Sequence, residues 1–176
     1  AATVIMHGPD VVDVATFGYM DLESREPLRP DAIFRMYSNT KIVTSVAAMM
    51  LWEQGAFGLD DPIEDHLPEF AGIRVLAPGA TSIDDTVAAD RSITPRQLLC
   101  HSAGLSYGFL ELDSLVDIAY LLAGIDVISG FEGTLADLCR RLGQLPLAHQ
   151  PGTAWRYSLS TDVVARLVEV LSGEPF

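Results

Sequence analysis

The sequence predicts an α+β fold, because a strand-rich N-terminal stretch precedes a long helical block. Residues 2–20 favour strands, since apolar and polar residues partly alternate on both sides of a Gly8-Pro9-Asp10 turn. From residue 38 onward, apolar residues recur at helical spacing, between residue types that begin or end helices. No internal repeat or long linker interrupts the 176 residues, a length that suits one domain of ordinary size.

The clearest predicted helix runs from Ser38 to Gln54. Ser38 can cap its N-terminus, and Gly55 is a typical residue to end it. An apolar face lies between them, composed of Ile42, Val43, Val46, Met49 and Met50. The chain as a whole is 49% hydrophobic, which is high for a small domain. We expect the excess to belong to a core or to an interface with further polypeptide.

Later helices are marked by capping signals. Thr94-Pro95 supplies a cap and a first-turn proline for a helix that should end near residues 101–104. Three more helices are expected, at about 112–123, 134–142 and 161–172. Thr134 with Asp137 resembles a capping box at the start of one of them.

The net charge of −13, from 24 acidic and 11 basic residues, bears on possible partners. Such a surface repels phosphate backbones and anionic headgroups, so we expect neither nucleic acid nor a membrane as a partner. The longest mainly apolar stretch, Ile42–Trp52, is too short to span a bilayer. Ala1–Met6 lacks the basic region of a signal peptide, which favours a cytoplasmic location. A periplasmic or secreted location stays open, because a processed terminus would look the same.

Cysteines and histidines give no sign of a metal or disulfide framework. Cys100 and Cys139 lie in apolar, helix-like segments and are expected to be buried free thiols, with a single bridge left open. His7, His66 and His149 are scattered without the spacing of metal ligands. We therefore expect no metal and no cofactor.

Ser38-Asn39-Thr40-Lys41 is an S-x-x-K sequence at the start of the predicted helix. Residues three apart share a helix face, with Cβ atoms within about 5–6 Å. A serine hydroxyl becomes a good nucleophile when a neighbouring base takes its proton, and a lysine can do so where burial disfavours its charged form. Backbone N–H groups at a helix start can stabilise the resulting oxyanion. On the pattern alone, a capping serine beside a solvated lysine is the favoured interpretation.

The wider context changes that interpretation. Phe34–Lys41 reads FRMYSNTK and resembles the nucleophile segment of serine β-lactamases and penicillin-binding proteins. Three further stretches carry the same resemblance in the same order: Gly55–Pro62 running on to Leu67-Pro68, Ile93–Leu99 followed by His101–Leu105, and Gln150–Gly152 followed by Trp155–Ser158. The resemblance covers nearly the whole chain and is closest to the class C-like branch, especially the family VIII carboxylesterases.

This resemblance implies a β-lactamase/transpeptidase-like fold within one larger catalytic domain. Residues 1–36 would form the N-terminal part of its sheet domain, and residues 37–176 the nucleophile helix and the helical region. It also implies a role for Tyr157, whose phenol would lie against Ser38 and Lys41 and share their proton transfers. A phenol needs a nearby cation to become a useful base, and Lys41 would supply one. An ordinary core tyrosine is the alternative.

Two departures from the family pattern bear on the substrate. Tyr157-Ser158-Leu159 stands where β-lactamases have Tyr-x-Asn, and that asparagine is associated with the amide side chain of β-lactams. Leu159 therefore favours an ester substrate. The third family motif, on a strand of the opposite wall, is missing before Phe176 together with the C-terminal sheet strands. We expect the missing C-terminal part of the same protein to be a partner that completes the site.

Gly104–Gly108 reads GLSYG and offers Ser106 as a rival nucleophile. The G-x-S-x-G pattern works on a sharp strand-to-helix turn, whereas the residues before Gly104 predict a helix. His101 could act as a base, but a polar cap at a helix end is the favoured interpretation.

The sequence thus predicts a serine hydrolase that cleaves a small-molecule substrate, a short-chain carboxylic ester, through an acyl-enzyme on Ser38. Lys41 and Tyr157 would activate first the serine and then a water. Hydrolysis of β-lactams or D-alanyl-D-alanine peptides by the same residues stays open. So does an inactive fragment, or a binding module, that needs its C-terminal complement.

Overall fold

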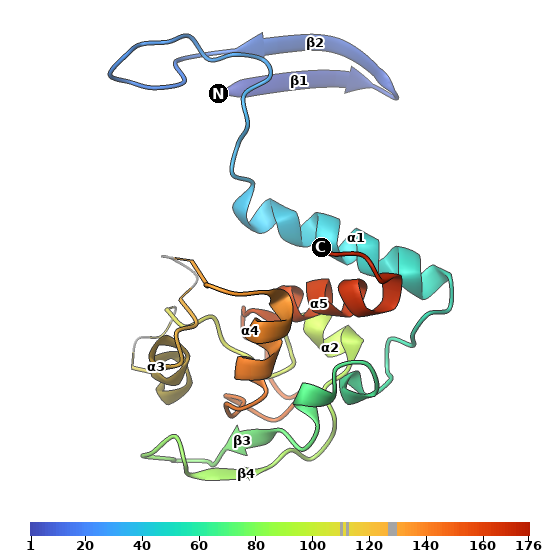
Figure 1. Ribbon diagram of the computed structural model, residues 1–176, viewed down its shortest axis with the longest axis vertical. Coiled ribbons are helices and arrows are strands. Elements are labelled where there is room, and N and C mark those ends of the chain that lie inside the picture. Colours follow the sequence, from blue (N-terminus) through green and yellow to red (C-terminus); the bar gives the residue numbers. More distant parts are fainter. Residues whose placement is uncertain (110, 112, 127–129) are drawn as a thin grey trace. The chain divides into compact units, whose positions relative to one another are not determined.

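The computed structural model describes residues 1–109, 111, 113–126 and 130–176 (Figure 1). The chain divides into two compact units, Ala1–Tyr37 and Ser38–Phe176. Each unit is described by itself below.

The first unit is a β-hairpin followed by an irregular segment. β1 (Ala2–His7) pairs antiparallel with β2 (Asp10–Thr16), and the register shifts between Ile5 and Met6. Gly8 has φ +60°, a backbone conformation that suits glycine in a tight turn. The strands predicted for this region are therefore confirmed. Large apolar side chains of both strands are exposed: Val4, Ile5, Met6, Val11, Val12 and Val14.

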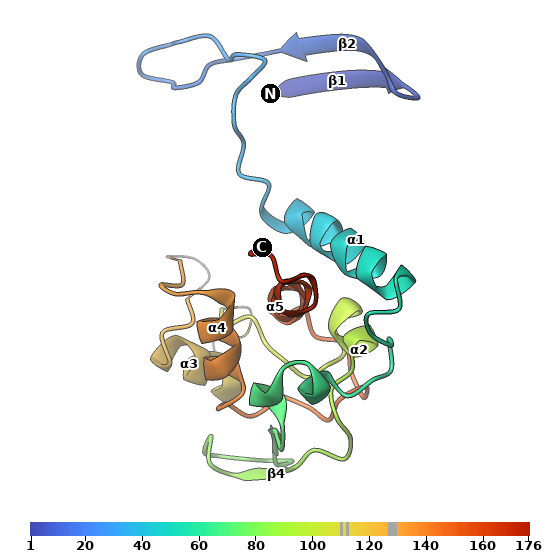
Figure 2. The same cartoon turned by 45° about the vertical axis from the view of Figure 1, so that its right-hand side comes forward.

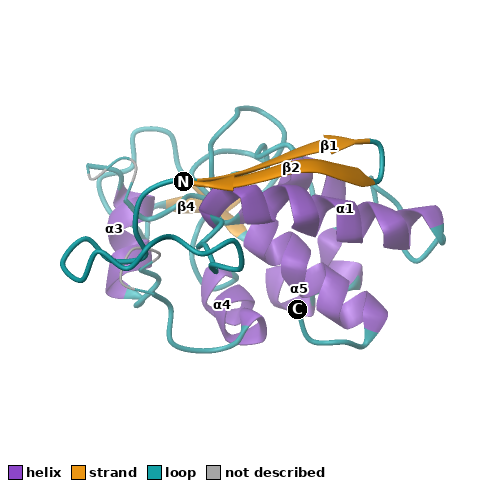
Figure 3. Cartoon of the chain, turned by 90° about the horizontal axis from the view of Figure 1, so that it is seen from above, coloured by secondary structure: helices purple, strands orange, loops and turns teal. Residues whose placement is uncertain are grey.

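The second unit is mainly helical (purple in Figure 3) and is built around α5 (Ser160–Ser172). Figure 2 looks nearly along α5, with α1 (Thr40–Glu53), α2 (Pro95–Leu99) and α4 (Leu135–Leu142) packed about it. α3 (Leu115–Leu122) contributes buried Val116 and Tyr120 to the same core. The core therefore lies within the helical unit, and α5 contributes Val163, Val164 and Leu167 to it.

Two short strands were not expected from the sequence. β3 (Arg74–Leu76) pairs antiparallel with β4 (Thr86–Ala88), in a part of the chain for which the sequence predicted no strand. Three residues are too few to establish a strand pattern, so the pairing depends on contacts between distant segments. Single-turn 3₁₀ helices occur nearby at Ile63–Asp65 and Pro68–Phe70.

The capping boxes begin helices as predicted. Thr94 accepts from the Gln97 backbone N–H while the Gln97 side chain accepts from Thr94, and Thr134 and Asp137 form the same reciprocal pair. Each pair satisfies two backbone donors that the first turn leaves unpaired. The helices predicted at 112–123, 134–142 and 161–172 are confirmed with small shifts, whereas α2 ends at Leu99, earlier than expected.

The expectation for the start of α1 is wrong, because Asn39, not Ser38, is the N-cap residue, and its side chain makes no capping hydrogen bond. The apolar face is exposed at Ile42, Val43, Val46 and Met50, so these residues are not part of the core. Thr44 and Ala48 are the buried residues of α1, and their small side chains one turn apart let α1 approach α5 closely.

The cysteine expectation is half correct. Cys139 is buried, but Cys100 is exposed, and both are free thiols. Within the described ranges, no helix has the length and hydropathy needed to cross a bilayer. The same part of the chain holds no cluster of His, Cys, Asp and Glu side chains that could bind a metal ion.

Candidate active site

Ser38 lies in a 3₁₀ turn, Tyr37–Asn39, that leads directly into α1. Its hydroxyl is exposed and shares a hydrogen bond with the phenol of Tyr157, with 2.8 Å between Oγ and Oη. The two residues are 119 positions apart in the sequence, so the fold alone brings them together. Ser38 stands one residue before Asn39, the N-cap residue of α1, and its described side-chain hydrogen bond is the one with Tyr157.

Lys41 lies on the face of α1 that is turned toward α5. It precedes Thr44 and Ala48 by one and two turns, the spacing that places side chains on one helix face. Its side chain is 18% exposed. Its Nζ lies 5.3 Å from the ring centroids of both Tyr157 and Tyr107. Among the described residues, no hydrogen bond joins Lys41 Nζ to Ser38 Oγ, so the phenol of Tyr157 links the serine to the neighbourhood of the lysine.

Asp162 in the first turn of α5 is the nearest anion to this lysine. Its Oδ2 lies 3.9 Å from Lys41 Nζ and, within the described part of the chain, accepts no hydrogen bond. Burial raises the pKa of the Asp162 carboxyl, and the positive charge of Lys41 opposes that rise. Sequence spacing gave no signal for this pair, because it depends on how α1 crosses α5.

Aromatic residues surround Tyr157. The ring of Tyr107 lies 5.2 Å from that of Tyr157, and the ring of His101 lies 4.7 Å away. Burial raises the pKa of the Tyr107 phenol. Sequence reasoning missed Tyr107, since it stands in the glycine motif only as a variable position.

His101 directly follows Cys100, the C-cap residue of α2, and its backbone N–H donates to the Leu98 carbonyl at 3.2 Å, so its backbone closes the helix end. Its Nδ1 lies 3.2 Å from Ser158 Oγ, and its backbone has φ +57°, unusual for a residue other than glycine. Burial, and then the charge of Lys41, lower the pKa of the imidazole, which favours its neutral form beside the lysine.

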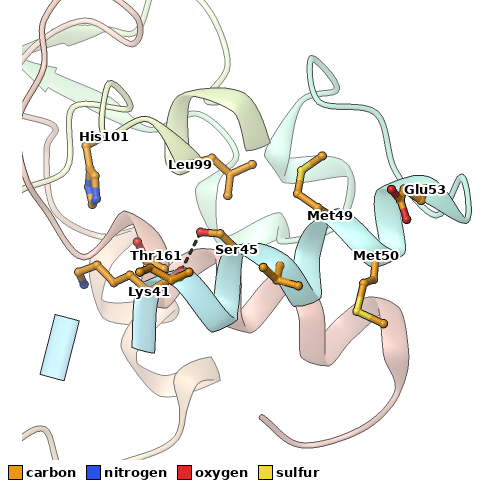
Figure 4. Close-up of a pocket in the computed structure, with 10 residues that line it drawn as sticks. Lys41, Ser45, Met49, Met50, Glu53, Leu99, His101 and Thr161 are labelled. Atoms are coloured by element: carbon orange, nitrogen blue, oxygen red, sulfur yellow. Dashed lines mark hydrogen bonds between the residues drawn. The ribbon is translucent and has the colours of Figure 1, made fainter. Parts of the chain in front are cut away.

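A cavity of about 520 Å³ extends along α1 from this group of side chains (Figure 4). Lys41 and His101 lie at one end, with the imidazole pointing toward the helix that carries the lysine, and Met49, Met50 and Glu53 lie farther along. The Ser45 hydroxyl donates to the Lys41 carbonyl within the same helix, at 2.8 Å. The lining is mostly apolar, which suits a hydrocarbon group more than a charged one.

The structure does not place Ser106 as a nucleophile. Ser106 has no exposed surface, and no strand-to-helix turn surrounds it. Its hydroxyl is engaged by Asp117 and by Arg156, whose Nε lies 2.8 Å from Oγ. A substrate could not reach this hydroxyl without unfolding the core.

Comparison with known proteins assigns the fold. The family model described as Beta-lactamase matches residues 1–176. The chain belongs to the beta-lactamase family. Its fold is β-lactamase/transpeptidase-like, as the sequence predicted. A solved structure of EstCE1, "a hydrolase with promiscuous acyltransferase activity", superposes with a TM-score of 0.76 at 32% identity, covering 99% of this chain and 42% of that one.

Beta-lactamase-family relatives with curated names include esterases. Esterase EstB from Burkholderia gladioli is 35% identical over 175 residues, which is 99% of this chain and 41% of EstB. Lovastatin esterase from Penicillium rubens is 34% identical over 153 residues, 85% of this chain and 36% of that protein. The chain thus spans about two-fifths of the length of the relatives it matches.

Proposed function

We propose that this protein is a serine hydrolase that cleaves short-chain carboxylic esters through an acyl-enzyme on Ser38. The observation that carries the proposal is the 2.8 Å hydrogen bond between Ser38 Oγ and Tyr157 Oη, beside the cation of Lys41. A serine hydroxyl that shares a hydrogen bond with a tyrosine oxygen can pass its proton along that bond when the tyrosine is a phenolate, the form that a neighbouring positive charge favours. The esterase names of two relatives agree with this reaction class.

The mechanism has two half-reactions. Ser38 Oγ attacks the ester carbonyl carbon while its proton passes to the Tyr157–Lys41 pair, which reacts in the form that lacks one proton, either phenolate with ammonium or phenol with amine. The carbon–oxygen bond to the alcohol then breaks, and the alcohol leaves with that proton. In the second half, a water gives a proton to the same pair and attacks the acyl carbon, which releases the acid and restores the Ser38 hydroxyl. Backbone N–H groups at the start of α1 are suited to stabilise the oxyanion that forms in each half-reaction.

Hydrolysis of β-lactams or of D-alanyl-D-alanine peptides by the same residues is the second candidate. The family model that matches the chain is described as Beta-lactamase, which supports the β-lactam reaction. Leu159 argues against it. Leu159 stands where β-lactamases have an asparagine. Its side chain is a hydrocarbon and only 2% exposed, so it cannot hydrogen-bond to a substrate amide. An ester needs no such contact.

Turnover of p-nitrophenyl butyrate and of nitrocefin by the active form of the protein tests both candidates. We expect butyrate turnover to exceed nitrocefin turnover, and Ser38→Ala to lose at least about a thousandfold in kcat. Ser172→Ala, at an exposed serine at the end of α5, is the matched control and should keep full activity. Ester turnover that survives in Ser38→Ala would overturn the proposal, and faster nitrocefin turnover would favour the second candidate.

We also propose that the active form includes polypeptide beyond residues 1–176, as part of the same protein. The exposed face of α1 supports this, since Ile42, Val43 and Val46 are each more than half exposed beside the candidate site, at 66%, 67% and 54%. Apolar patches of this kind usually mark an interface. The relatives' greater length supplies sequence that could cover the patch.

A further inference from the structure

Ser106, the serine of the G-x-S-x-G motif, belongs to a largely buried polar cluster, which we call the Arg156 cluster. It consists of Ser106, Glu111, Asp117, Tyr120 and Arg156. Arg156 Nε donates to Ser106 Oγ at 2.8 Å, and Nη1 donates to a Glu111 carboxylate oxygen at 2.7 Å. Nη2 lies 3.4 Å from Asp117 Oδ1, and the Ser106 hydroxyl donates to the same oxygen.

Most of the Arg156 cluster is buried, so its polar groups must keep their hydrogen-bond partners. Ser106 and Asp117 have no exposed surface, Tyr120 is 1% exposed, and the Arg156 side chain is 17% exposed. A buried carboxylate is tolerated only when charged and hydrogen-bonding partners surround it. Asp117 also accepts from the Glu111 backbone N–H at 3.0 Å, while Tyr120 Oη accepts from the Ser106 N–H at 3.2 Å. A shift of Ser106, Asp117 or Arg156 would leave a buried polar group unpaired, whereas the Glu111 side chain is 58% exposed and can bond to water.

The cluster is joined directly to the candidate active site through the backbone. Arg156 is the residue before Tyr157, and its N–H donates to the His101 carbonyl at 2.9 Å. On the other side of Tyr157, the Leu159 N–H donates to the Ser106 carbonyl at 3.0 Å. The segment that carries Tyr157 is thus fixed on both sides to the 101–106 segment, and the Arg156 side chain fixes the same two segments together.

We propose that Ser106, Asp117 and Arg156 are positioning residues that hold Tyr157 Oη against Ser38. This inference rests on the proposed function of Ser38 and Tyr157, and it assigns the G-x-S-x-G serine a role other than attack. The cluster itself contacts neither Ser38 nor Lys41 in the described hydrogen bonds. It acts through the placement of one phenol, and a displacement of about 1 Å can cost up to a hundredfold in rate.

A double-mutant cycle separates this role from a general effect on folding. The rate of Ser38 labelling by a fluorophosphonate is measured in the active form of the protein, for Ser106→Ala, Asp117→Asn and Arg156→Lys. Each change is made alone and together with Tyr157→Phe. We expect each single variant to label about tenfold more slowly, but less than about twofold more slowly once Tyr157→Phe is present. The reason is that a misplaced Tyr157 phenol and a missing Tyr157 hydroxyl remove the same contribution to the activation of Ser38, so the two losses should not add.

Arg96→Lys, at an exposed residue outside the Arg156 cluster, is the matched control. Arg96→Lys alters the exposed ion pair with Asp60 and should change labelling in neither background. Thermal unfolding of each variant identifies any that fail to fold, and Arg156→Lys, which keeps the charge, serves where Asp117→Asn does not fold. Equal losses in both backgrounds, or folded variants that label at the wild-type rate, would overturn the positioning role. Absence of label on Ser38 in the unmodified protein would instead refute the proposed function itself.

Discussion

At the scale of single residues, the S-x-x-K spacing made Ser38 and Lys41 candidates, and the family resemblance of the surrounding stretches favoured them as nucleophile and base. Tyr157 required the family resemblance, since nothing in its local sequence distinguishes it from a core tyrosine. The structure places its phenol 2.8 Å from Ser38 Oγ, and the catalytic roles of all three residues remain predictions. Tyr107 and Asp162 could not be predicted, because each reaches Lys41 only through tertiary packing.

His101 offers a prediction that depends on pH. Its lowered pKa means that the folded state binds a proton less readily than the unfolded chain does. Above the unfolded pKa of about 6.5 both states are neutral and the residue contributes nothing to the pH dependence. As the pH falls below that value, the unfolded state gains the proton first, so we expect the free energy of unfolding to fall between pH 7 and 5.

Denaturant unfolding at several pH values measures this effect. His101→Asn should lose less stability over the same interval, and asparagine tolerates the positive φ at this position. Ser172→Ala, at the exposed end of α5, removes no titratable group, so it is the control and should leave the pH dependence unchanged. The same slope in His101→Asn and in the unmodified protein would contradict the assignment.

At the scale of elements, the sequence was most informative where local chemistry decides the structure. Thr94 and Thr134 are real caps because their partners lie three residues away. Ser38 has the residue type of a cap, but Asn39 takes the N-cap position and the Ser38 hydroxyl bonds to the distant Tyr157 phenol. β3 and β4 were missed for the same reason, since pairing between remote three-residue segments leaves no local pattern.

The Thr134 cap gives a test of stability at this scale. Thr134→Ala removes the hydroxyl that accepts from the Asp137 N–H at 3.2 Å, and we expect a loss of about 0.5–2 kcal/mol in the free energy of unfolding. Asn39→Ala changes an N-cap residue without a capping hydrogen bond and should cost less. Urea denaturation compares the two variants, and equal losses in the free energy of unfolding would show that the Thr134 capping box does not stabilise α4.

At the scale of the whole molecule, composition predicted an excess of apolar residues that belongs to a core or to an interface, but it could not decide between the two. The structure assigns much of it to the exposed strands of the hairpin and to α1. Intact mass with size-exclusion chromatography tests whether further polypeptide is required. Because we propose that it is, a purified 19.0 kDa chain should show little or no esterase activity. Full activity from that species alone would refute the requirement.

The central claim is that Ser38, and no other serine, is activated for acyl transfer. Fluorophosphonate labelling of the active protein, followed by peptide mapping, tests it most directly. We predict a single modified peptide that contains Ser38, with labelling lost in Ser38→Ala. Label on the peptide that contains Ser106, or ester turnover by a protein whose Ser38 remains unmodified, would contradict the account.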